Sequence, residues 1–86
     1  MPEVSRFDGI VSRMFFREHG PPHFHAEYSG QQAVFGIEDL TVLRGRIPPR
    51  ASGIVKEWAL LHQAELRAAW DRARRQEAPG KIAPLE

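Results

Sequence analysis

Short runs of alternating hydrophobic and polar residues extend to about residue 47, and apolar residues then recur every three or four positions. The first pattern is typical of strands and the second of a helix. We predict strands over residues 9–17, 23–28, 33–37 and 40–47. Because the connections between them are short, antiparallel neighbours are favoured, and the simplest topology is a four-stranded meander.

A single long helix is predicted over residues 50–76, beginning after the double proline Pro48-Pro49. Its apolar stripe includes Trp58 and also His62, so we expect His62 to be a core histidine held neutral by a hydrogen bond. Residues 79–86 are expected to form a loosely held tail. The expected fold class is therefore α+β, with one domain over residues 1–86 and the helix packed on one face of the sheet.

The alternation in strand 23–28 assigns the two faces of the sheet. Phe24 and Tyr28 would point inward beneath the helix, and His23 and His25 would point outward to solvent. The other residues expected to face inward are Ile10, Met14, Phe16, Ala26, Ala33, Phe35, Ile37, Leu43 and Ile47. The outward face is then basic and partly apolar, which is typical of a contact surface. The expected binding face comprises Arg13, Phe15, Arg17, His23, His25, Glu27, Arg44 and Arg46.

Composition narrows the classes of function. The 86 residues include no cysteine, which excludes a disulfide framework, a thiolate metal site and a cysteine nucleophile. The net charge of +1 gives little attraction to nucleic acid or anionic lipid, so RNA binding would need a locally basic face. No apolar run approaches the ~18 residues that span a bilayer, and the amino terminus lacks a signal-peptide pattern. We therefore expect a cytoplasmic protein with no membrane partner.

The segment His19-Gly20-Pro21-Pro22-His23-Phe24-His25-Ala26-Glu27-Tyr28 resembles the signature of a small bacterial family, the domain of unknown function numbered 4160. Residues 5–10, 45–48 and 58–70 are similar to the same family, so the resemblance covers about residues 2–76. It implies a cytoplasmic prokaryotic protein, often encoded beside another small protein in an arrangement suggestive of toxin–antitoxin pairs. It implies no established activity and no catalytic residues.

His23 and His25 also suggest a metal site. A His-x-His pair on a strand places two imidazoles on one face with Cα atoms about 6.5–7 Å apart. Together with His19 and Glu27, the pair would ligate a divalent transition metal in the manner of catalytic zinc or non-haem iron. The alternative is that these are surface imidazoles, hydrogen-bonded to the double-proline turn and the neighbouring strands.

Several functions remain open from the sequence. The leading hypothesis is a binding module of a toxin–antitoxin-like pair that contacts a small protein encoded nearby, or RNA, through the binding face. His23 and His25 are the candidate catalytic residues, either of a metal-dependent hydrolase or of a weak metal-independent endoribonuclease whose arginines hold the phosphate. A third alternative is a structural protein that forms a homo-oligomer through its open sheet face.

Overall fold

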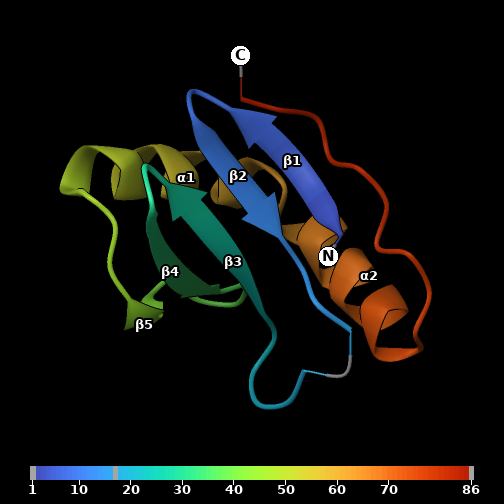
Figure 1. Ribbon diagram of the computed structural model, residues 1–86. Helices are drawn as coiled ribbons and strands as arrows, with labels where there is room; N and C mark the ends of the chain where they lie inside the picture. Colours follow the sequence, from blue (N-terminus) through green and yellow to red (C-terminus); the bar gives the residue numbers. More distant parts are fainter. Residues whose placement is uncertain (1, 17, 86) are drawn as a thin grey trace.

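An antiparallel meander and two carboxy-terminal helices make up the fold in the computed structural model, which describes residues 2–16 and 18–85. The α+β class and the antiparallel sheet are thus confirmed. The strands, in sheet order, are β1 (Glu3–Phe7), β2 (Ile10–Arg13), β3 (His23–Tyr28), β4 (Gln31–Gly36) and β5 (Val42–Gly45). The helices are α1 (Pro49–Leu61) and α2 (Gln63–Arg74). Figure 1 shows α1 behind the sheet and α2 continuing past the start of β1.

The sheet has one strand more than the four predicted, because the sequence analysis missed β1. This strand joins β2 through a tight turn at Asp8 and Gly9, where φ is 50° and 76°. Two-residue hairpin turns need positive φ at both central positions, and Asp-Gly is one of the residue pairs that provides it. The predicted strand over residues 9–17 is accordingly shorter, since the chain leaves the sheet after Arg13.

The prediction of one long helix is also wrong, because the helix is interrupted at His62, where φ is −122° and ψ is 25°. The side chain of Gln63, at the start of α2, donates hydrogen bonds to the backbone oxygens of Ile37 and Glu38 at 2.8 and 3.1 Å. These contacts fix the start of α2 against the β4–β5 connection. Neither helix of the described residues is long and apolar enough to span a bilayer.

The core lies between the sheet and the helices, as the strand alternation predicted. Phe24 is fully buried and its ring contacts that of Trp58 at a centroid separation of 5.7 Å. Two residues predicted to face inward are exposed instead: Phe16 at 42% and Leu43 at 41%. Phe16 follows the end of β2, and Leu43 lies at a register shift between β4 and β5, so neither follows the regular alternation.

The carboxy-terminal segment is not a loose tail, because it packs along the outer side of β1 (Figure 1). The backbone N–H of Ile82 donates to the Val4 carbonyl at 2.7 Å, and the Trp58 indole N–H donates to the Ala83 carbonyl at 2.8 Å. The side chain of Ile82 is 5% exposed and belongs to the core. The tail therefore covers the β1 edge of the sheet.

We expect Ile82→Ala to lower the free energy of unfolding by about 2–4 kcal/mol, because it removes a buried side chain that the tail contributes to the core. Urea unfolding followed by tryptophan fluorescence would measure the change. Lys81→Ala, at an exposed neighbouring position, is the matched control and should change stability by less than about 0.5 kcal/mol. If Ile82→Ala lowered the free energy of unfolding no more than Lys81→Ala does, the packing of the tail would not stabilise the fold.

Candidate metal centre

His23 and His25 are buried, which corrects the prediction that they point into solvent. Their exposed fractions are only 4% and 8%. The Trp70 ring from α2 lies 4.8 Å from the His23 ring, and the Phe15 ring packs edge-on against His25 at 4.4 Å. The alternation of β3 still holds, because Phe24, which lies between the two histidines, belongs to the main hydrophobic core and the histidines do not. The histidines are therefore covered by neighbouring side chains without entering the main core.

The Glu18 carboxylate brings the two histidines into one cluster. Its Oε1 atom lies 2.5 Å from His25 Nε2 and 3.3 Å from His23 Nε2. One potential ligand atom from each of the three residues lies within 4.8 Å of the other two. We refer to Glu18, His23 and His25 as the His-Glu cluster. Two imidazole nitrogens and one carboxylate oxygen are a common donor set for transition metals.

The ring orientation of His23 is set by a backbone contact. His23 Nδ1 lies 2.8 Å from the carbonyl oxygen of Pro21, and because a carbonyl can only accept, Nδ1 carries the proton. In the neutral ring Nε2 is then left with a lone pair. That atom is buried and has no hydrogen-bond partner among the described residues, because its lone pair and Glu18 Oε1, 3.3 Å away, can both only accept. Such a backbone contact behind the ring is the usual support of a metal-ligating histidine.

His25 contacts Glu18 through Nε2, while its other ring nitrogen is isolated. Nδ1 of His25 is buried without a hydrogen-bond partner among the described residues. Leaving a buried polar group unpaired costs about 1–3 kcal/mol. The His-Glu cluster therefore carries a local energetic cost, which is typical of a functional site more than of a structural one.

The environment of Glu18 favours its ionised form. Burial raises the pKa of this carboxyl, but the hydrogen bond with His25, and the attraction to either imidazole when it carries a proton on both nitrogens, lower it by more. The net result is that the pKa of Glu18 lies below its ordinary value. The carboxyl is therefore ionised at neutral pH, which is the form that ligates a metal ion.

The other two residues of the predicted metal set lie outside the His-Glu cluster. The Glu27 carboxylate accepts hydrogen bonds from Arg13 at 3.0 Å and from Gln32 at 3.2 Å. His19 is exposed and lines a shallow hollow together with His23. Glu18 was not predicted, because nothing in the alternation of β3 indicates which residue before the double-proline turn folds back over the strand.

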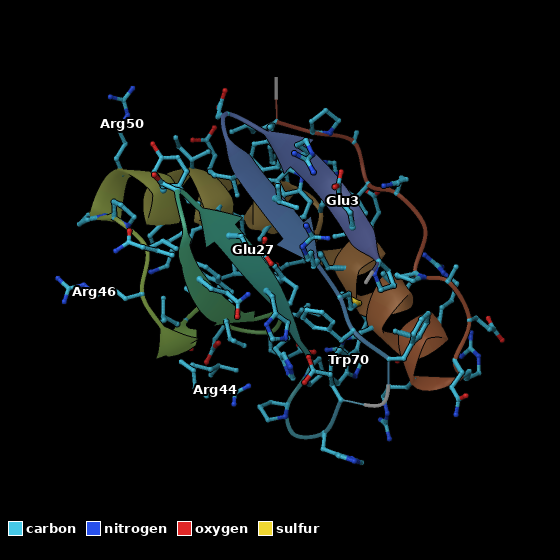
Figure 2. All side chains as sticks on the ribbon, viewed as in Figure 1. Glu3, Glu27, Arg44, Arg46, Arg50 and Trp70 are labelled. Atoms are coloured by element: carbon cyan, nitrogen blue, oxygen red, sulfur yellow. The ribbon has the colours of Figure 1, made fainter. Side chains whose placement is uncertain are left out.

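The arginines of the predicted binding face differ in their surroundings. Arg13 is engaged with Glu27, whereas Arg44 and Arg46 are exposed and form no ion pair within the described residues. Arg17 lies outside the described residues. Figure 2 shows Arg44 and Arg46 on the β5 side of the molecule, with Arg46 pointing away from the sheet. The face is therefore only partly the continuous basic surface that the sequence predicted.

His62 is separate from the His-Glu cluster and is not the core histidine that was predicted. It lies at the α1–α2 junction with its side chain 18% exposed, and Nδ1 is 2.6 Å from Glu65 Oε1. Its ring still contacts Trp58, at a centroid separation of 5.9 Å. The interruption of the helix moves it to the edge of the core.

We expect His23 to carry its proton on Nδ1 when the ring is neutral, because the Pro21 carbonyl accepts from that atom. Long-range ¹H–¹⁵N correlation spectra of the metal-free protein at mildly alkaline pH would assign the two ring nitrogens. The exposed His19 provides an internal reference in the same spectrum. A proton on Nε2 of His23 would show that the lone pair does not face the His-Glu cluster.

Comparison with known families agrees with the resemblance seen in the sequence. The family described as "Domain of unknown function (DUF4160)" matches residues 9–71. This range is more than half of the chain, and the chain therefore belongs to that family. It includes the His-Glu cluster and β5 but not β1 or the tail. No curated protein and no solved structure matches the chain.

Proposed function

We propose that this DUF4160 protein binds one divalent transition metal ion through Glu18, His23 and His25. The observation that carries the proposal is the convergence of ligand atoms from three residues within 4.8 Å, beside a buried His23 Nε2 that has no hydrogen-bond partner within the described chain. Two histidines and one carboxylate are a donor set of catalytic zinc and non-haem iron sites, where further coordination positions are left for water or substrate.

The two distances between Glu18 and the histidines need little change to accommodate a metal ion. Bonds of about 2.0–2.1 Å at tetrahedral angles place neighbouring ligand atoms about 3.3 Å apart. His23 Nε2 and Glu18 Oε1 already have this separation, and the 2.5 Å contact between Glu18 and His25 would open by less than 1 Å. A metal ion would also replace the direct contact of the carboxylate with His25 by two metal–ligand bonds.

Metal-assisted hydrolysis is the reaction class that this arrangement supports best. A metal ion held by three protein ligands lowers the pKa of a bound water molecule and polarises a carbonyl or phosphoryl oxygen. A metal-independent ribonuclease is less well supported, because one nitrogen of each ring is already engaged: His25 Nε2 with Glu18 and His23 Nδ1 with the Pro21 carbonyl. General acid–base catalysis would need both rings within reach of the substrate.

We expect purified protein to bind one Zn²⁺ or Co²⁺ ion per chain, and Glu18→Ala, His23→Ala and His25→Ala each to weaken binding. The loss should exceed the about 10–100-fold that removal of an outer-shell partner causes, since each substitution removes a ligand. Isothermal titration calorimetry and the visible spectrum of the Co²⁺ form would measure it.

His19→Ala and Glu27→Ala are the matched controls for this experiment, because both residues are of ligand type but lie outside the His-Glu cluster. They should leave metal affinity within about threefold of the wild type, the ordinary context dependence of such measurements. Wild-type protein that takes up no stoichiometric metal would refute the proposal. Equal losses in the controls would show that the ion binds elsewhere.

A second candidate function is a binding module in a toxin–antitoxin-like pair, with the β5 side of the sheet as the contact surface. Supporting it, β5 is the last strand of the sheet and all four of its residues are exposed. Val42 and Leu43 are each 41% exposed, beside Arg44 and Arg46, which form no ion pair in the part of the chain that the structure describes. An uncovered edge strand can pair with a strand of another protein.

Co-expression with a small protein encoded nearby, which the family resemblance implies, would test the second candidate. We expect Leu43→Glu to abolish co-purification, because it places a charge in the exposed apolar part of β5, whereas Leu60→Glu on α1 should have no effect. RNA as the ligand would give a different result: binding that weakens steeply as salt rises and does not depend on the partner. Co-purification that survives Leu43→Glu would exclude this edge as the contact.

A further inference from the structure

We infer that the proposed metal centre takes a phosphate-type oxyanion, with the Arg44 guanidinium as its second anchor. The inference rests on the proposed metal site and adds the chemical class of its ligand. It follows from the strand register, from the hollows beside the His-Glu cluster and from the charge of Arg44.

The register of the sheet places Arg44 in line with His25. His25 pairs with Val34 on β4, and Val34 pairs with Arg44 on β5. Side chains at paired positions point to the same face, so all three lie on the face away from the main core. Adjacent strands are about 4.7–4.9 Å apart, which places the Cα atoms of His25 and Arg44 about 10 Å apart. An arginine side chain can cover most of that distance.

Two hollows occupy the space between Arg44 and the histidines. One is lined by His25, Val34 and Arg44, together with Gln32 and Gly45. The other is lined by His19, His23 and Arg44, together with Pro21, Val34 and Leu43. Val34 and Arg44 line both. A ligand that enters either hollow therefore meets an imidazole of the His-Glu cluster on one side and the guanidinium on the other.

Arg44 has no competing carboxylate in this position. Among residues 2–16 and 18–85 it forms no ion pair, whereas Arg13 in the same cross-strand row is engaged with Glu27. Arg46, two residues further on, lines neither hollow. Gly45 between them has φ of 73°, which interrupts the strand and turns Arg46 away from Arg44. Only Arg44 of this pair is placed to act with the metal centre.

An oxyanion with several equivalent oxygens suits this pair of anchors. One oxygen would enter an open coordination position of the metal ion, and two others would accept the parallel N–H donors of the guanidinium. Arginine binds phosphate in this two-pronged manner, and the contact is strengthened by charge. Phosphate can give one oxygen to the metal ion and two to the guanidinium, whereas a carboxylate that binds the metal ion through one oxygen has only one left for the arginine.

The test is titration of the Co²⁺-loaded protein with inorganic phosphate, followed by calorimetry and by the visible absorption of the Co²⁺ ion. We expect phosphate to change the Co²⁺ spectrum and to bind about tenfold more weakly to Arg44→Gln, the loss of one charge-assisted contact. Arg46→Gln is the matched control and should bind phosphate as the wild type does. Acetate should bind more weakly than phosphate to all three proteins.

The possible outcomes separate this inference from the proposed function. If the wild type takes no Co²⁺, both fail. If it takes Co²⁺ but phosphate leaves the spectrum unchanged, or if Arg44→Gln and Arg46→Gln behave alike, only the oxyanion inference is overturned. A 5′-phosphorylated trinucleotide in the same titration identifies the source of the phosphate: tighter binding than inorganic phosphate assigns a nucleic-acid end, and weaker binding assigns a free phosphate or a small ester.

Discussion

Burial of the His23 and His25 imidazoles beside one carboxylate is the constraint on which the rest of this site depends. Polar ring nitrogens removed from water need a partner, and among residues 2–16 and 18–85 two of the four have none while a third has only Glu18. The fold keeps them buried by packing Trp70 and Phe15 against the rings. This part of the outer sheet face is thus shielded from solvent, and its polar ring nitrogens form few hydrogen bonds.

Much of the fold was predictable because strand alternation is a local property. The positions of Phe24 and Ala26 in the core follow from period two alone. The missed β1 had a local signal too, since Asp8-Gly9 between two apolar runs is a strong hairpin indicator. The break at His62 had no such signal. It depends on the contact of Gln63 with the β4–β5 connection, which apolar periodicity does not report.

The site was harder to predict than the fold, because it depends on how an irregular segment returns to the sheet. His23 and His25 could be identified by their spacing on one strand. Glu18 lies before a double-proline turn, and its place over His25 depends on the path of that turn. The role proposed for Arg44 required the register of three strands, since His25, in the same cross-strand row, is 19 positions earlier in the chain. Such distant pairings are set by tertiary packing.

The tail along β1 has a consequence for how copies of this protein can associate. Edge-to-edge joining of β5 in one copy to β1 in the next would repeat without end and build a filament. The backbone contact of Ile82 with Val4 occupies the β1 side, so that head-to-tail growth is blocked. Association through sheet edges is then possible only at β5. Because each copy offers one free edge, pairing of β5 with β5 gives a dimer and cannot continue to a third copy.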